Sequence, residues 1–443
     1  MSLFDRLYGS AVIAAHLPGQ TRFPFSSRAS IEALRDRRVR RMVAYAAAHV
    51  PYYRDLFSRE RIAPRAIRTA SDLDRLPPTE KSLVRSQPDL FLADTPQGKT
   101  ALSFLTSGST GQPTRVHHDR HSLLCNIAWG ERERDPQVKA AGSFRPTEVY
   151  IGNETAVIRD VTAFYNANTL MPRPRRRFVS VLTPIEEVAA LVNDRKPDLL
   201  VGYGGWIDQF FKTVAARGIE IHRPKMALYM AEALPHGGRA FIEETFGVPV
   251  LSRYSAAEAF KIGYVCECRA GFHLHEDLTH LRIVRPDGTN ADPGETGEIV
   301  ISNLVNRGSV LLNYRIGDVG SIDPKPCACG RTLKRLSELE GRIEDIVALP
   351  DGGFVHPRAF WEVFKHDARI LQYQIVQLDL RRFELKLTTV SDADFTEAYA
   401  ALQPRLLQIL GADAVIEASR RSEYDRSEGK KFRAVSSRVT RPR

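Results

Sequence analysis

Short apolar runs alternate with amphipathic segments through the middle of the chain. The runs at 198–202, 226–230 and 248–251 are each bounded by polar residues and predict buried strands. The segments 206–217 and 235–246 carry apolar positions at helical spacing and predict helices between those strands. Strands that alternate with helices in this way form parallel βαβ units, in which binding sites lie at the carboxyl ends of the strands.

The N-terminal part of the chain has a helical and basic pattern. Apolar positions at helical spacing from Ser30 to Val50 predict a long helix with Ser30 as its cap and Pro51 as its end. Similar short patterns continue to about residue 100. We therefore expect a helical leader region over residues 1–100.

The pattern changes again after Phe272. Alternating apolar positions at 280–284 and 297–301, with the turn sequence 286–288 between them, predict antiparallel strands. The C-terminal hundred residues predict strands near 373–378 and 383–389 and a helix at 395–410. These segments indicate a smaller α+β domain.

A chain of 443 residues is too long for one ordinary core, so more than one domain is expected. The change of pattern near Gly341 divides it into residues 1–341 and 342–443. The predicted fold class is α/β: a large N-terminal domain with parallel βαβ sheets and a β subdomain, followed by a small, mobile α+β lid.

The composition is that of a soluble globular enzyme, with 43% hydrophobic and 26% charged residues. The net charge of +10 is spread along the chain, and its one local run, 173–177, is typical of a solvated surface. We therefore expect no nucleic-acid partner, although a positive excess suits a pocket for nucleotide phosphates. No apolar segment is long enough to cross a bilayer, and 11–15 is too short for a signal-peptide core, so no membrane partner and a cytoplasmic location are expected.

A loop of small hydroxylated residues and glycines at 103–114 carries the most specific signal. Glycine lets backbone N–H groups approach a phosphate, and Ser and Thr hydroxyls add donors without bulk. The spacing and the lysine of a Walker loop are absent. The candidate phosphate-binding residues are Thr106, Ser107, Gly108, Ser109, Thr110 and Gly111.

Four further strings follow this loop in chain order: Tyr254–Glu258, Tyr314–Asp318, Gly341–Asp345 and Glu428–Lys431. Together with the loop, they resemble the motifs of the adenylate-forming superfamily of acyl-CoA synthetases, luciferases and non-ribosomal adenylation domains. The leader sequence 41–53, the string 202–204 and the string 327–331 are most similar to the phenylacetate-CoA ligase branch and its capsule-biosynthesis relatives.

The resemblance implies a role for each nucleotide-binding residue. Tyr254 would pack on adenine beside the segment Ala231, Glu232 and Ala233. Asp318 would bind the ribose hydroxyls, with Arg342 close by. Glu258 would hold Mg²⁺ and is assigned, with Lys430, to catalysis.

Lys430 would bridge the reacting carboxylate and the α-phosphate, and Glu344 would be the hinge of the lid. The acid pocket is expected beside Tyr203, Gly204, Ser255 and Ala256. Trp206 and the neighbouring tyrosines favour an aryl or other apolar acid.

Four of the five cysteines fall in two close pairs, at 266/268 and 327/329. Cys266, His273, Cys327 and Cys329 match zinc in ligand type and number. Cys268 competes for the first position and His275 for the histidine, and reduced cysteines without metal are the alternative. A zinc ion here would be structural, since Mg²⁺ serves the phosphate chemistry.

The sequence departs from the family pattern at three places. Gln112 stands where most relatives have lysine, and Ser255–Ala257 lacks the usual glycine and hydroxyl before the magnesium glutamate. The run 349–357 replaces the string that faces the thiol in relatives that use CoA.

The predicted function is ATP- and Mg²⁺-dependent adenylation of a carboxylic acid, followed by transfer of the acyl group, with the CoA thiol as the first choice of acceptor. One alternative is a CoA-independent ligase that joins the adenylate to an amine or another nucleophile. A second is a catalytically weak nucleotide-binding protein of a biosynthetic assembly. The oligomeric state is open, with a homodimer as one alternative.

Overall fold

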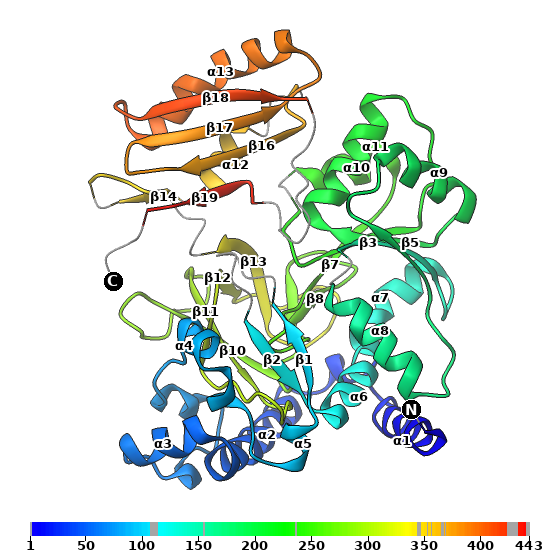
Figure 1. The fold of residues 1–443 in the computed structure, drawn as a ribbon, viewed down its shortest axis with the longest axis vertical. Helices are drawn as coiled ribbons and strands as arrows, with labels where there is room; N and C mark the ends of the chain where they lie inside the picture. Colours follow the sequence, from blue (N-terminus) through cyan, green and yellow to red (C-terminus); the bar gives the residue numbers. More distant parts are fainter. Residues whose placement is uncertain are drawn as a thin grey trace. The chain divides into compact units, whose positions relative to one another are not determined.

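The computed structural model describes residues 2–106, 114–153, 156–234, 237–342, 347–351, 353–355, 357–364, 367, 369–422 and 433–439. Its contacts divide the chain into two compact units (Figure 1). The first contains residues 1–147, 154–176 and 251–339, and the second contains residues 148–153, 177–250 and 340–443.

The central part of the second unit has the predicted βαβ pattern. Its strands follow the order β6–β5–β3–β4, and β3, β5 and β6 run parallel. Leu200 of β5 and Ala227 of β6 lie in one apolar core with Phe210, Phe211 and Ile242 of the helices. The helices of this part surround its strands in Figure 1. The bounds are β3 Thr147–Gly152, β4 Arg175–Ser180, α9 Ile185–Arg195, β5 Leu199–Tyr203, α10 Gly204–Ala216, β6 Met226–Met230 and α11 Gly238–Phe246.

The C-terminal part of the second unit is a small α+β layer. Its sheet follows the order β18–β17–β16–β19, with β16 and β17 antiparallel and the outer pairs parallel. Phe383, Leu385 and Leu387 alternate along β17 and are fully buried in one core with both helices. The bounds are β14 Val347–Ala348, β15 Phe354–Val355, α12 Pro357–Phe364, β16 Gln372–Gln377, β17 Arg382–Thr388, α13 Asp392–Leu410, β18 Val415–Arg421 and β19 Val435–Ser437.

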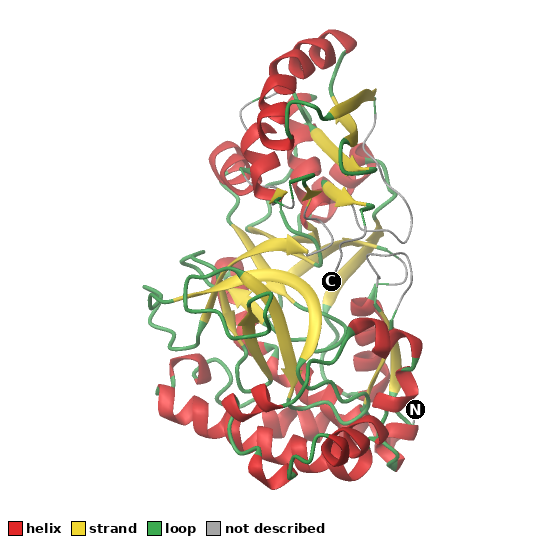
Figure 2. Ribbon diagram, turned by 90° about the vertical axis from the view of Figure 1, so that its left-hand side faces the viewer, coloured by secondary structure: helices red, strands yellow, loops and turns green. Residues whose placement is uncertain are grey.

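The first unit contains a largely antiparallel sheet, whose strands are among those drawn in yellow in Figure 2. Its strand order is β10–β11–β12–β13–β9–β8–β7. The pairs β10/β11, β11/β12, β9/β13, β8/β9 and β7/β8 are antiparallel. The bounds are β7 Val250–Tyr254, β8 Gly263–Val265, β9 Phe272–Leu274, β10 Thr279–Val284, β11 Gly297–Asn303, β12 Tyr314–Asp323 and β13 Arg335–Arg342. A separate hairpin is formed by β1 Leu102–Leu105 and β2 Arg115–His118.

Helices make up most of the first hundred residues, as predicted. A buried ion-pair network joins two helices of this unit to the segment just before β10: Arg38 and Arg132 both bind the fully buried carboxylate of Asp277, at 2.6 Å each. The helices of this unit are α1 Leu3–His16, α2 Arg28–His49, α3 Pro51–Arg59, α4 Lys81–Ser86, α5 Pro96–Lys99, α6 Arg120–Trp129, α7 Glu131–Ala141 and α8 Val157–Asn168. Short 3₁₀ turns cover Phe23–Phe25, Pro64–Ala66, Ser71–Arg75 and Pro88–Phe91. Among these described helices and those of the second unit, none has the length and apolar character needed to cross a membrane.

The predicted α/β fold class is confirmed, and one local prediction, the cap of the long helix, is wrong. Ser27, not Ser30, caps α2: its hydroxyl accepts a hydrogen bond from the backbone N–H of Ser30. The predicted end of this helix at Pro51 is confirmed: α2 ends at His49 with Val50 as its C-cap. Pro51 then opens the separate helix α3, because a proline at the first helical position needs no backbone N–H. The division into domains at residue 341 stays a prediction: the compact units change at 339/340, but the second unit also includes 177–250.

Candidate active site

The predicted phosphate loop is carried by the β1/β2 hairpin. Its central residues, Ser107 to Pro113, lie outside the described residues, and with them Gly108, Ser109, Thr110, Gly111 and Gln112. At the base, the N–H of Thr106 donates to the carbonyl of Thr114 at 2.9 Å, and the N–H of Thr114 donates to Oγ1 of Thr106 at 3.0 Å. The Thr106 hydroxyl therefore closes the base of the loop.

Two of the predicted motifs are joined by a reciprocal pair of hydrogen bonds in the first unit. The hydroxyl of Tyr254, at the end of β7, donates to Oδ2 of Asp318 at 2.7 Å. The hydroxyl of Tyr314, at the start of β12, donates to Oε1 of Glu258 at 3.1 Å. Each tyrosine thus orients the carboxylate of the other motif, although the two motifs are about sixty residues apart along the chain.

The carboxylate of Glu258 lies in a closed environment, with 4% of the residue exposed. Burial, and then the neighbouring carboxylate, raise the pKa of Tyr314 well above its usual value, so this hydroxyl remains a donor at neutral pH. An oriented carboxylate oxygen is the ligand type that Mg²⁺ prefers. Glu258 therefore fits the assigned magnesium ligand.

His118 was not selected as a site residue from the sequence. It is the last residue of β2, and its Nε2 donates to the carbonyl of Ala257 at 2.6 Å. Burial lowers the pKa of His118 to about 4, so the ring is neutral at physiological pH. His118 therefore links the hairpin of the phosphate loop to the segment that carries Glu258.

Asn303 holds the same segment from the other side. Its side-chain amide donates to the backbone carbonyl of Glu258 at 3.0 Å. Ser255 and Ala256, predicted to line the acid pocket, are half-buried in this segment.

The sequence signal for His118 was its position shortly after the phosphate loop, but nothing in the sequence identified the carbonyl of Ala257 as its hydrogen-bond partner.

The second unit carries the remaining residues predicted for the nucleotide, the acid and the hinge. Gly204 opens α10, and a Cβ at this position would lie 2.4 Å from the carbonyl carbon of Ala233 and 2.5 Å from the backbone nitrogen of Leu234. Ala231 follows β6 with a φ of 68°, in the left-handed region that L residues rarely adopt. The backbone of 231–234 therefore packs directly on Gly204.

Tyr203 ends β5, and its ring belongs to the apolar core of the second unit. Its hydroxyl accepts a hydrogen bond from the backbone N–H of Asn153 at 3.3 Å. Arg342 is the last residue of β13. Glu232 follows Ala231, with its N–H donating to the carbonyl of Met230 at 2.8 Å. Glu344 and Lys430 lie outside the described residues.

The predicted zinc ligands Cys266, His273, Cys327 and Cys329 converge in the first unit, with all ligand atoms within 4.8 Å of one another. The Sγ atoms of Cys266 and Cys327 are 3.7 Å apart, and Sγ of Cys329 is 3.4 Å from Nε2 of His273. Two thiolates on one tetrahedral zinc are about 3.8 Å apart, and a thiolate and an imidazole about 3.5 Å. The four donors therefore fit zinc in type and spacing.

Neither competing residue belongs to this group of four donors, although Cys268 lies beside Cys327. Cys268 is exposed, and the buried ring of His275 lies against Tyr264 and, through Nε2, 3.8 Å from Glu133. Arg331 and Arg335 lie beside Cys329 and Cys327, respectively, and would offset the negative charge of three thiolates. The cluster connects the end of β8, the start of β9 and the turn before β13.

Comparison with known proteins shows similarity to one group of enzymes over most of the chain. A phenylacetate-coenzyme A ligase of Thermus thermophilus is 26% identical over 404 residues, which cover 89% of this chain and 87% of that protein. The enzyme of the same name from Escherichia coli is 23% identical over 92% of this chain and 95% of its own length. No family model matches.

The chain resembles the adenylate-forming ligases. Among solved structures, a 2-hydroxyisobutyryl-CoA ligase in the postadenylation state aligns with a TM-score of 0.76 and 17% identity, covering 95% of this chain and 91% of that one. This structural likeness concerns the fold. The predicted resemblance to the superfamily and to its phenylacetate-CoA ligase branch is confirmed, and the named relatives are ligases, as the predicted enzyme class requires.

Proposed function

We propose that the protein uses ATP to adenylate a carboxylic acid and then transfers the acyl group to a thiol or another nucleophile. The observation that carries this proposal is the reciprocal pairing of Tyr254 with Asp318 and of Tyr314 with Glu258. It brings together a carboxylate suited to ribose hydroxyls and a carboxylate suited to a hard cation. The similarity to phenylacetate-coenzyme A ligases supports the same reaction class.

Charge neutralisation is the main chemical task in this reaction, because a carboxylate must approach a polyanionic phosphate. Glu258 would hold Mg²⁺, which offsets phosphate charge when bound. Asp318 would accept the ribose hydroxyls, which a carboxylate can do with both oxygens. Lys430 would place its ammonium group beside the reacting carboxylate.

We propose an aryl or other apolar acid as the substrate. Tyr203 and Trp206 lie at the carboxyl end of β5, where an α/β sheet usually binds its ligand, and both are largely buried. The names of the curated relatives support the aryl class for the acid.

CoA is the acceptor that the relatives favour. The run 349–357, which differs from the string of CoA-using relatives, favours an amine or another nucleophile instead. In the structure, this run starts directly after β14 and includes β15, which pairs with β14 through Val347–Val355 and Ala348–Phe354. The acceptor is therefore the first property to measure after adenylation itself.

We propose that the cluster of Cys266, His273, Cys327 and Cys329 holds a structural zinc ion. The ion would fix β8 and β9, which directly follow the segment 254–258 along the chain. Its four protein ligands leave no open coordination position, which is typical of a structural site. The phosphate chemistry would therefore not involve this ion.

The test of the proposed function is pyrophosphate release from ATP and Mg²⁺ with a panel of aryl and alkyl acids, with and without CoA. Lys430→Ala should lower the rate by a factor on the order of 10²–10³, because it removes one transition-state cation. The neighbouring Lys431→Ala is the matched control and should retain most of the activity. Product that forms only with CoA identifies the thiol as acceptor, whereas product with an amine alone identifies the amide-forming alternative. A protein that binds ATP but releases no pyrophosphate with any acid would contradict the enzymatic proposal and support the assembly role.

A further inference from the structure

Three side chains with metal-binding atoms meet where α1 contacts α6, outside the sites described above. They are His16, His121 and Cys125, and their ligand atoms all lie within 4.8 Å of one another. His16 is the last residue of α1. His121 and Cys125 are four residues apart on α6 and therefore share one face of that helix.

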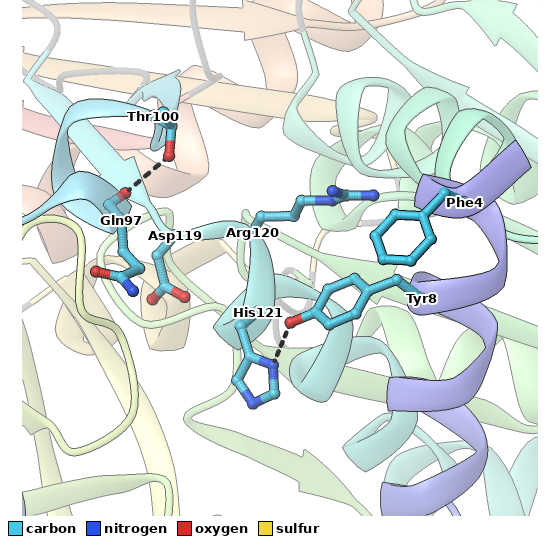
Figure 3. Close-up of a pocket in the computed structure, with 7 residues that line it drawn as sticks. All are labelled: Phe4, Tyr8, Gln97, Thr100, Asp119, Arg120 and His121. Carbon is cyan, nitrogen blue, oxygen red and sulfur yellow. Dashed lines mark hydrogen bonds between the residues drawn. The ribbon is translucent and has the colours of Figure 1, made fainter. Parts of the chain in front are cut away.

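The hydrogen bonds of both rings leave Nε2 available. Nδ1 of His16 lies 2.9 Å from the carbonyl oxygen of Val12, which can only accept, so Nδ1 carries the proton and a neutral ring has its lone pair on Nε2. Nδ1 of His121 is bound to the hydroxyl of Tyr8 at 3.0 Å (Figure 3). A partner on the second ring nitrogen is the usual arrangement of a metal-bound histidine.

The separation of the donors fits a shared cation. Nε2 of His121 lies 3.6 Å from Sγ of Cys125, against about 3.5 Å for a thiolate and an imidazole on one tetrahedral zinc. A simple hydrogen bond from the thiol to the imidazole would also give this contact. Such a hydrogen bond would not explain why the His16 ring lies in the same place, because Nδ1 of His16 already bonds to the Val12 carbonyl of its own helix.

The site is reached from solvent on one side and closed on the other. Cys125 is buried, with 2% exposure, among the apolar residues that pack α1 on α6, such as Ile13 and Leu124. His121 is exposed and lines a cavity of about 310 Å³ together with Tyr8 and Arg120 (Figure 3). A cation can therefore enter beside His121, and a water molecule can occupy a fourth position.

We propose that His16, His121 and Cys125 form a second metal site, which takes an exchangeable zinc-like divalent cation and fastens the end of α1 to α6. Two imidazoles and one thiolate are a donor set that zinc and cobalt accept. The proposal does not depend on the adenylation chemistry or on the first cysteine cluster.

The test counts metal ions on the full-length, metal-depleted protein titrated with Co²⁺, whose thiolate complexes absorb in the near ultraviolet and visible range. Wild-type protein should bind about two equivalents, one at each cysteine-containing cluster. Cys125→Ser and His121→Asn should each lose one equivalent and its absorption, whereas Cys329→Ser should lose the other. Cys268→Ser removes an exposed cysteine that lies beside the first cluster but is not one of its four donors. It is the matched control and should bind as much cobalt as the wild type.

Tyr8→Phe separates metal binding from folding, because it keeps all three ligands and removes only the hydrogen bond to Nδ1 of His121. We expect cobalt affinity at this site to fall by roughly 10-fold or more. Unchanged cobalt binding and absorption in both Cys125→Ser and His121→Asn would overturn the proposal and leave a cysteine–histidine hydrogen bond. Because His121 is exposed, His121→Asn decides the question even if Cys125→Ser is poorly folded.

Discussion

Two tyrosine hydroxyls join the candidate site residues of the motifs 254–258 and 314–318 by hydrogen bonds. Tyr254 donates to Asp318, and Tyr314 donates to Glu258, so each motif supplies both a donor and an acceptor. Phenylalanine at either position would keep the ring and remove one of these two hydrogen bonds. The two carboxylates have different proposed ligands, so the two changes should have different kinetic consequences.

Tyr314→Phe should raise the Mg²⁺ concentration needed for half-maximal pyrophosphate release by roughly 10-fold, about 1.4 kcal/mol, because Glu258 loses an orienting hydrogen bond in a buried position. Tyr254→Phe should mainly raise the KM for ATP, because its hydroxyl holds Asp318. Titrations of Mg²⁺ and of ATP on both variants distinguish the two effects. Equal effects of both variants on both titrations would contradict the division of roles.

His118 gives a prediction for stability against pH. Burial lowers its folded-state pKa to about 4, below the usual 6.5, so the folded protein favours the neutral ring. The stabilisation is complete above pH 6.5 and is lost as pH falls from 6.5 toward 4, by up to about 1.4 kcal/mol per pH unit. His118→Gln retains an N–H donor for Ala257 and removes this titration.

Urea unfolding at pH 7.5 and pH 5 provides the measurement. The free energy of unfolding should fall less between the two pH values in His118→Gln than in the wild type, by about 1–2 kcal/mol. The same loss in both proteins would show that His118 is not the titrating group.

The turn from β5 into α10 depends on a single glycine, Gly204. The backbone of Ala233 and Leu234 occupies the space where any Cβ at Gly204 would lie, at 2.4–2.5 Å. Sequence comparison suggested Gly204 as part of an acid pocket, whereas the structure shows a close packing contact with the segment expected to bind adenine. Gly204 therefore allows the backbone of Ala233 and Leu234 to pack against it, and this role does not depend on a contact with the acid.

Gly204→Ala should displace the segment 231–234 and raise the Kd for ATP by roughly 10-fold or more, with the fold of the second unit retained. Gly202→Ala on the same strand is the matched control, because its Cβ would meet Ile151 at an ordinary contact distance of 3.4 Å. Isothermal titration with a non-hydrolysable ATP analogue measures both. If the two variants bind the analogue equally well, the segment 231–234 does not contact the nucleotide.

At the scale of the molecule, the two compact units are stabilised by different means. The second unit has two apolar cores, one around β5 and β6 and one around β16 and β17. The first unit adds the buried Arg132–Asp277–Arg38 ion pairs and the cysteine–histidine cluster. Loss of metal should therefore affect the first unit selectively.

Cys329→Ala should remove the proposed structural zinc and destabilise the protein by about 4 kcal/mol when free zinc exceeds its Kd a thousandfold. Thermal unfolding with and without added zinc is the measurement. The wild type should shift more with zinc than the variant, which keeps only the site of His16, His121 and Cys125, whereas Cys268→Ala should behave as the wild type. A chelator that leaves the wild-type unfolding temperature unchanged would argue against the zinc ion.

Much of the fold could be predicted from local pattern. The strands at 199–203 and 226–230 and the helix over 395–410 follow apolar periodicity, which depends only on neighbouring residues. The antiparallel pair of β10 and β11 was predicted from alternation and a turn sequence. The prediction of helix caps was less accurate, as for α2, which is capped by Ser27, because several nearby serines satisfy the same local preference.

The candidate sites were predictable only where ligands lie close together in sequence or in a known motif. Cys266 and His273, like Cys327 and Cys329, form short local pairs, and the structure brings the two pairs together. His16 could not be assigned to Cys125, because more than a hundred residues separate them and only the packing of α1 on α6 makes them neighbours. His118 was missed for the same reason, since its partner is a backbone carbonyl that no sequence pattern marks.

The amino-acid sequence was therefore sufficient for the fold class, the order of the motifs and the chemical types of their ligands, because these depend on local periodicity and residue chemistry. Which carboxylate each tyrosine holds, why Gly204 must lack a side chain and which histidines face which cysteines emerged from the folded chain. These relations join residues far apart in sequence, and their distances are set by how strands and helices pack against one another.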